Sequence, residues 1–321
     1  MINSIQYLRG IAALLVVWYH STIKATQNDL PNAEVFYFGQ SGVDLFFIIS
    51  GFIICFVTDK KKFTCFNFLK GRVSRIIPLY WFFTLIALVA FIMVPHLVNS
   101  SGGETLILHS FFLLPTEQKY LIQNGWTLSY EFYFYLICTV ILFFNLNKTW
   151  LLLTLITLPI VGQLFDIYFF FDKFLIEFAM GVFSYVLYSR KALLRKHIYF
   201  LTCIISGWLL LTLFDYDTYR TVKYGLLMWF LFHLGLLINH KLDVDSKIGK
   251  LLNEIGNSSY ALYLSHTFSL VVLNKVYLYF FGNNSTIFYL LLLTSISVVI
   301  GYFVFKYIET PLNHITKKIL N

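Results

Sequence analysis

Residues 39–57 read GQSGVDLFFIISGFIICFV, and Asp44 is the one charged side chain among them. An α-helix of about 20 apolar residues crosses the hydrocarbon core of a bilayer. Lipid offers the backbone no hydrogen-bond partners, so a crossing segment satisfies its own polar groups by forming a helix. This stretch therefore predicts a transmembrane helix.

The rest of the chain has the same character. Of its 321 residues, 58% are hydrophobic and 12% are charged, whereas charged residues make up about 25% of a typical soluble domain. This composition excludes an ordinary soluble enzyme. Hydropathy predicts ten helical spans, at residues 4–23, 39–57, 78–98, 126–144, 150–165, 168–188, 198–214, 222–239, 260–281 and 286–306.

We expect an all-α protein, a polytopic integral membrane bundle of about ten transmembrane helices. No internal repeat or linker rich in Pro and Gly divides the chain, so we expect one domain over residues 1–321. The first apolar run contains Arg9 and is not followed by a small-residue cleavage site. It is therefore interpreted as a retained span and not as a signal peptide.

Charge divides the connections between spans into two sets. One set carries 17 lysines and arginines and the opposite set carries five. Cytoplasmic connections of membrane proteins are enriched in these residues, which places both termini in the cytoplasm. The net charge of +8 thus reports orientation, and it gives no support to a nucleic-acid partner. The four cysteines show no CxxC or paired spacing, so we expect neither a disulfide nor a metal site.

Ionisable side chains inside spans are candidates for function, because each costs about 2.5–3.5 kcal/mol on insertion scales. They are Arg9, His20, Asp44, Glu131, Glu177, His233, His266 and Lys275. Arg9 and His20 are eleven residues apart, which places them on one helix face about 16 Å apart. His20 has the chemistry of a general base, or its ring is satisfied by a carbonyl at the membrane interface.

Two carboxylates are predicted at a depth similar to that of His20. Glu131 and Asp44 each suit the role of orienting His20 and stabilising its protonated form. The alternative for Asp44 is a buried, hydrogen-bonded acid that supports helix packing. For Glu177 we expect such a structural role.

Arg72 and Arg75 lie three residues apart before the third span. On a helix they share a face at the cytoplasmic surface, and paired guanidinium groups suit phosphate oxygens. The alternative is an ordinary basic flank that fixes topology, which lysine would satisfy equally well.

Seven short motifs occur in order along the whole chain. They are Arg9 and His20 with ten residues between them, GVDLFFIISGF at 42–52, RVSRIIP at 72–78, WTLSYE at 126–131, EFAMG at 177–181, SYALYLSH at 259–266 and ETP at 309–311. Together they resemble the successive signatures of the acyltransferase-3 family, in particular members that lack an appended extracytoplasmic hydrolase-like domain. Ser265 and Thr267 flank His266 where many members carry aromatic residues.

The resemblance implies a ten-span enzyme of the bacterial cytoplasmic membrane. Such an enzyme moves acyl groups, usually acetyl, from cytoplasmic acyl-CoA to a hydroxyl of a surface polysaccharide or its lipid-linked precursor. It implies catalytic roles for His20, Glu131, Asp44 and Arg9, contacts to acyl-CoA from Arg72, Arg75 and Arg9, and contacts to the acceptor from Trp126, Tyr130 and His266. Acetyl-CoA is then the donor substrate, and no metal is expected.

Other mechanisms and functions are compatible with parts of this pattern. Direct transfer and a two-step relay through an acetyl-histidine are both compatible with the residues. A transporter or flippase of glycan intermediates is also polytopic with buried charges, but the internal repeat and the interrupted spans of such proteins are missing. A glycan polymerase would be expected to have a larger extracytoplasmic loop.

Overall fold

The computed structural model describes residues 2–60, 64–95, 103–165, 170, 172–189, 192–212 and 221–320. Within these ranges the fold is helical, and its β-structure is limited to an isolated bridge between Thr105 and Lys119. The chain is a multi-pass membrane protein with an all-α bundle. The expected span ends at 98, 168 and 214 lie outside the described residues, as do Lys61, Lys62, Arg190, Lys191 and Arg220 from the two charge sets.

Each predicted span coincides with a helix, and the bounds shift by a few residues in most cases. The matching helices are α1 (Asn3–Gln27), η1 with α2 (Tyr37–Gln40 and Ser41–Lys60), α3 (Cys65–Met93), α6 (Gly125–Phe143), α7 (Lys148–Phe165), α8 (Phe174–Ser189), α9 (Ala192–Thr212), η2 with α10 (Thr221–Gly225 and Leu226–Ile238), α12 (Ser259–Phe281) and α13 (Thr286–Val304). Within the described ranges, five helices are long and apolar enough to cross a membrane, and three shorter ones are also apolar. The number ten and the cytoplasmic termini stay predictions.

The helix of the third span begins earlier than the predicted span. Pro78 was expected to open the span, but α3 begins at Cys65 and contains the proline in its interior. Thr64 caps the helix by accepting a hydrogen bond from Asn67 N at 3.2 Å, and such a cap fixes a helix start. Arg72 and Arg75 therefore lie on α3, in the part of the helix that precedes the predicted span.

Three short helices were not predicted at all. They are α5 (Ile107–Phe112), α11 (Lys247–Asn257) and α14 (Thr310–Leu320), which follows the π-helical turn η4 (Phe305–Glu309). The apolar residues of α11 are Ile248, Leu251, Leu252 and Ile255, a helical spacing that the sequence already contained. All three helices are too short to register as spans, and α11 and α14 are also too polar.

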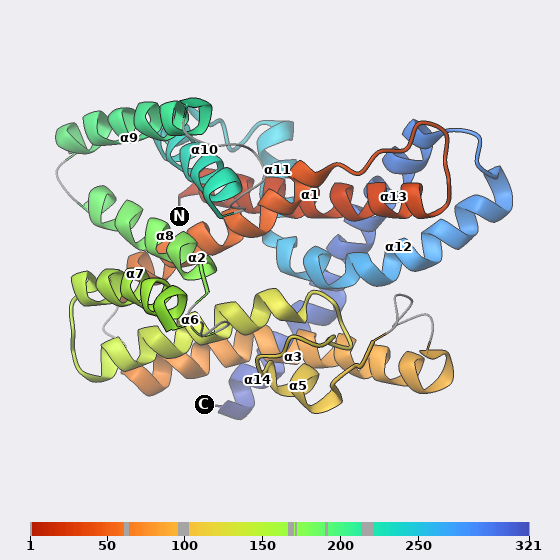
Figure 1. Cartoon of the computed structure of the whole chain (residues 1–321), viewed down its shortest axis with the longest axis horizontal. Helices are drawn as coiled ribbons and strands as arrows, with labels where there is room; N and C mark the ends of the chain where they lie inside the picture. Colours follow the sequence, from red (N-terminus) through yellow and green to blue (C-terminus); the bar gives the residue numbers. More distant parts are fainter. Residues whose placement is uncertain are drawn as a thin grey trace. The chain divides into compact units, whose positions relative to one another are not determined.

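The chain divides into two compact units, which are described separately. The first comprises Met1–Ile49 and Leu187–Ile308, and the second comprises Ser50–Val186 and Glu309–Asn321. In the first unit α1 packs against α11, α12 and α13, and α9 packs against α10 (Figure 1). In the second unit α3 packs against α5, α6 and α14. The expectation of a single domain stays a prediction.

Large apolar side chains are exposed along the outward faces of the long helices. On α3 they include Leu85, Val89, Ile92 and Met93, which are between 53% and 75% exposed. A contiguous apolar surface of this kind marks contact with a membrane or a partner. In a chain with this many apolar helices it is the surface that faces lipid.

Two glycines allow neighbouring helices to approach α1 closely. A Cβ added at Gly256 of α11 would lie 2.1 Å from Gln6 O, and one added at Gly42 of α2 would lie 2.3 Å from Ala12 O. Both distances are far below van der Waals contact, and the obstructing atoms belong to backbone. Small residues at such crossings are how membrane helices pack without a hydrophobic driving force.

We predict that Gly256→Ala lowers thermal stability, because the added methyl group pushes α11 away from α1. Forcing an extra carbon into a packed site costs about 1–3 kcal/mol. Gly71→Ala is the matched control, since Gly71 of α3 has no atom within 4 Å of such a carbon and alanine favours a helix. The temperature at which the detergent-solubilised monomer is lost measures both effects, and equal stability of the two variants would contradict the close contact.

Candidate active site

His20 and His266 lie side by side in the first unit. His20 is on α1 and His266 is on α12, and their ring centroids are 5.0 Å apart. His266 Nε2 is 3.3 Å from His20 Nδ1. The sequence assigned these two residues to different roles, and only the packing of α1 on α12 brings the rings together.

Carbonyl oxygens fix the proton on each ring. His20 Nδ1 is 2.9 Å from Val16 O, and His266 Nδ1 is 3.2 Å from Leu262 O. A carbonyl only accepts hydrogen bonds, so both Nδ1 atoms carry the proton in the neutral rings. His266 Nε2 then presents its lone pair to the His20 Nδ1 proton. The remaining nitrogen, His20 Nε2, holds the lone pair that makes the ring a base.

The arrangement resembles a catalytic triad in which the third group is an imidazole. In a triad a carboxylate on Nδ1 holds the ring in place and favours its protonated form. Here the neutral His266 ring accepts from Nδ1 and orients His20 without supplying a negative charge. The carbonyl contact that was considered as an alternative for His20 is present, and it is compatible with a basic Nε2.

Arg9 and Asp44 also belong to the first unit. Arg9 donates from Nη1 to Gln6 Oε1 at 3.0 Å, one turn away on the same helix. Asp44 is fully buried in the first turn of α2, where a carboxylate is stabilised by the positive end of the helix dipole. Both its predicted role beside His20 and the alternative of a packing residue stay predictions.

Glu131 lies in a polar cluster of the second unit. Its Oε1 accepts hydrogen bonds from Ser50 Oγ, at 2.9 Å, and from the hydroxyl of Tyr135. The Arg72 guanidinium lies over the Tyr135 ring, 5.8 Å from its centroid. Ser50 and Tyr135 were not predicted from the sequence, although Tyr135 stands four residues after Glu131, where side chains on one helix meet.

Arg72 and Arg75 differ in their surroundings. Arg75 is exposed, whereas Arg72 is partly covered and its Nε is a buried donor without a hydrogen-bond partner among the described residues. Buried donors normally have partners. An unsatisfied guanidinium nitrogen is therefore a position for an acceptor such as a phosphate oxygen.

Trp126 and Tyr130 form an aromatic cluster with Phe174 in the second unit. The three pairs of ring centroids are between 5.3 and 6.1 Å apart. The Tyr130 hydroxyl donates to Asp172 Oδ2 at 3.2 Å.

In the connection before α6, burial raises the pKa of Tyr120, which keeps its hydroxyl available as a donor to Leu114 O at 2.6 Å.

Glu177 and His233 are two further predicted candidates. Glu177 is fully buried in the first turn of α8, and His233 is packed among Tyr199, Trp229 and Phe232. Across the part of the chain that the structure describes, no group of three or more His, Cys, Asp or Glu side chains is placed to hold a metal ion. All four cysteines are free thiols.

The chain is similar to one family model and to several known proteins. A family model described as an acyltransferase domain matches residues 2–306. The exopolysaccharide production protein ExoZ of Rhizobium meliloti is 28% identical over 75% of this chain and 79% of its own length. The O-acetyltransferase OatA of Staphylococcus aureus is 26% identical over 95% of this chain, which spans 56% of the length of OatA. No solved structure matches.

We predict that both rings of the His20 and His266 pair carry their proton on Nδ1 at neutral and alkaline pH. Nitrogen-15 NMR of protein with labelled histidine rings distinguishes the two tautomers. Signals that disappear in His20→Gln and in His266→Gln assign the two rings. A proton on Nε2 of either ring would contradict the hydrogen-bond pattern described above.

Proposed function

Because this chain belongs to the acyltransferase family whose model covers residues 2–306, we propose that it is a membrane O-acyltransferase with a polysaccharide acceptor. The acyl group is acetyl, the donor is acetyl-CoA from the cytoplasm, and the acceptor is a hydroxyl of a bacterial surface polysaccharide or its lipid-linked precursor. The names of ExoZ and OatA support polysaccharide chemistry and acetyl transfer respectively. The enzyme works in the bacterial cytoplasmic membrane.

The observation that carries this proposal is the orientation of His20. Its Nδ1 proton is held by Val16 O and faces His266 Nε2, which leaves Nε2 as the basic nitrogen. A transfer to a hydroxyl needs such a base, because the oxygen must lose its proton as it attacks.

In the proposed reaction, His20 alone carries the proton from the acceptor to the leaving group. His20 Nε2 takes the proton from the acceptor hydroxyl as its oxygen bonds to the acyl carbon. The carbon–sulfur bond then breaks, and the proton passes from Nε2 to the departing thiolate, which gives free CoA. Glu131 and Asp44 remain the proposed carboxylates that stabilise protonated His20. In the competing relay, His20 Nε2 itself accepts the acetyl group first.

The proposed donor contacts are Arg72, Arg75 and Arg9. The buried Nε of Arg72 supports phosphate binding, and Arg75 lies one turn further along α3. Both belong to the strongly positive set of connections and their flanks, which the positive-inside rule assigns to the cytoplasm. Arg9, on α1, is proposed to help place the thioester.

The proposed acceptor contacts lie at the start of α6. Trp126 and Tyr130 stand in its first two turns, on the side predicted to face away from the cytoplasm. Their clustered rings offer apolar faces, and Asp172 fixes the hydroxyl of Tyr130. His266 was predicted to contact the acceptor, and its position beside His20 supports an orienting role as well.

The direct test uses purified protein in lipid nanodiscs with radiolabelled acetyl-CoA and isolated lipid-linked glycan. We expect label in the glycan and acceptor-dependent release of CoA. His20→Gln should lower this rate about 10²- to 10⁴-fold, the usual contribution of a general base. His240→Gln, at an exposed histidine, is the matched control and should leave the rate unchanged.

Two outcomes would count against this assignment. Absence of acetyl transfer with intact, folded protein would exclude the proposed activity and favour transport. Activity of His20→Gln within a few-fold of the parent would make His20 an orienting residue and would move the role of base to Glu131 or Asp44.

The donor site gives a separate prediction. Arg72→Lys keeps the positive charge but loses the planar fork that binds phosphate in a bidentate manner. We expect about a tenfold higher KM for acetyl-CoA, which corresponds to about 1.4 kcal/mol, with normal amounts of protein in the membrane. Lys70→Ala on the same helix is the control and should leave KM unchanged. The same KM in Arg72→Lys would assign Arg72 to topology only.

A further inference from the structure

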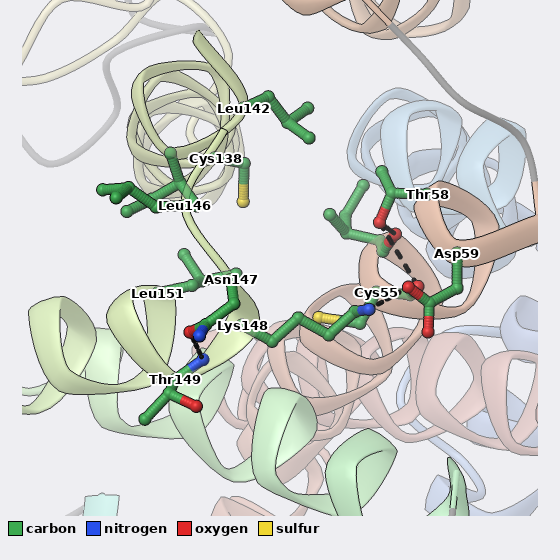
Figure 2. A pocket seen from close by; sticks show the side chains of 12 residues that line it. Cys55, Thr58, Asp59, Cys138, Leu142, Leu146, Asn147, Lys148, Thr149 and Leu151 are labelled. Atoms are coloured by element: carbon green, nitrogen blue, oxygen red, sulfur yellow. Dashed lines mark hydrogen bonds and ion pairs between the residues drawn. The ribbon is translucent and has the colours of Figure 1, made fainter. Parts of the chain in front are cut away.

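A cavity of about 490 Å³ opens in the second unit. It is formed by the end of α2, the end of α6, the turn that follows α6 and the start of α7, as Figure 2 shows. Its volume falls within the range of small-molecule binding sites. None of the proposed catalytic residues lines it, so the mechanism above leaves it without a role.

The inner wall of the cavity is apolar. Ile54, Ile141 and Leu151 line it and are each less than 9% exposed, and Leu142 points into it from α6 (Figure 2). Surfaces of this kind suit a flat, weakly polar ring. They do not suit a sugar, whose hydroxyl groups would lose their hydrogen bonds to water.

The mouth of the cavity is polar. Lys148 and Asp59 form an ion pair there and remain 28% and 44% exposed. Exposed pairs contribute little to stability, so an anionic ligand can replace Asp59 on Lys148 at low cost. Asn147 uses Oδ1 to accept from Thr149 N at 3.0 Å, which leaves its Nδ2 as a donor for a ligand.

Two thiols line the cavity, and one of them shares a helix face with Glu131. Cys55 and Cys138 face the cavity from α2 and α6 (Figure 2). Glu131, Tyr135 and Cys138 are spaced by four and three residues and so share one face of α6, over about 10 Å. Arg72 lies over the ring of Tyr135, which stands between Glu131 and Cys138 on that face. Arg72 is therefore between the cavity and Glu131.

We infer that this cavity binds the adenine nucleotide end of the acyl-CoA donor. The adenine ring lies between the apolar side chains, the phosphate on its ribose reaches Lys148, and the pyrophosphate continues to Arg72. The rest of the donor then runs along α6 toward Glu131. This inference rests on the proposed function, because it names where one part of that donor binds. It adds Lys148 and Asn147 as recognition residues for the nucleotide.

The two cavity thiols allow a direct test with the full-length protein. In a Cys65→Ser/Cys203→Ser background, N-ethylmaleimide reports on Cys55 and Cys138 alone. We expect adenosine 3′,5′-bisphosphate, which has no thiol, to slow their labelling at least fivefold. S-acetylpantetheine, the other end of the donor, should not slow it. Labelling of either thiol at a rate that adenosine 3′,5′-bisphosphate leaves unchanged would overturn the inference.

A second measurement uses the size of the cavity. Leu142→Trp fills it, whereas Val140→Trp places the same ring on the exposed face of α6, where Val140 is 53% exposed. We expect Leu142→Trp to raise the KM for acetyl-CoA and the inhibition constant of adenosine 3′,5′-bisphosphate at least tenfold. The kcat should change little, and Val140→Trp should behave like the parent.

The outcomes separate this inference from the proposed function. Normal acetyl transfer, with no protection by adenosine 3′,5′-bisphosphate and an unchanged KM in Leu142→Trp, would overturn the cavity assignment and leave the enzyme assignment intact. Protection by S-acetylpantetheine alone would also overturn it. Failure of the parent protein both to transfer acetyl and to bind the bisphosphate would overturn both.

Discussion

Lipid provides no hydrogen-bond partners, and this constraint determines more than the helical fold. Polar side chains inside such helices also turn back to their own backbone. His20 and His266 each bond to the carbonyl of the residue four positions earlier, Val16 O and Leu262 O. Those contacts decide which nitrogen carries the proton. The lack of hydrogen-bond partners in lipid therefore favours helices at α1 and α12 and also leaves Nε2 of His20 as the basic nitrogen.

Close helix contacts set where these prepared groups meet. Gly256 and Gly42 let α11 and α2 approach the backbone of α1, and α1 packs in turn against α12. A shift of α1 along its axis by one residue would move His20 by about 1.5 Å, which is enough to break a contact of 3.3 Å with His266. The glycines at these helix crossings therefore help to set the geometry of the histidine pair, although they carry no polar side chain.

The second unit holds its charges by a different arrangement. Glu131 accepts hydrogen bonds from the hydroxyl groups of Ser50 and Tyr135. Arg72 lies on an aromatic face, and its buried Nε has no hydrogen-bond partner among the residues that the structure describes. Buried charges are costly unless they are hydrogen-bonded or paired. An anionic ligand would supply the missing partner of Arg72, which is why we place donor binding in this unit.

The amino-acid sequence by itself determined the fold class, the helical nature of all ten apolar segments and the family. These depend on local composition, periodicity and short motifs, which act over a few residues. It also singled out His20, Glu131 and Arg72, because an ionisable side chain in or beside an apolar span is costly wherever it lies.

Only the tertiary structure decided which of these residues meet. His20 and His266 are 246 positions apart, and Ser50 and Glu131 are 81 apart. No local pattern reports such distances, because they depend on how helix faces pack. The start of α3, the short helix α11 and the cavity beside Cys138 were likewise beyond the sequence, since a proline inside a helix and an empty volume between helices are tolerated or created only by their neighbours.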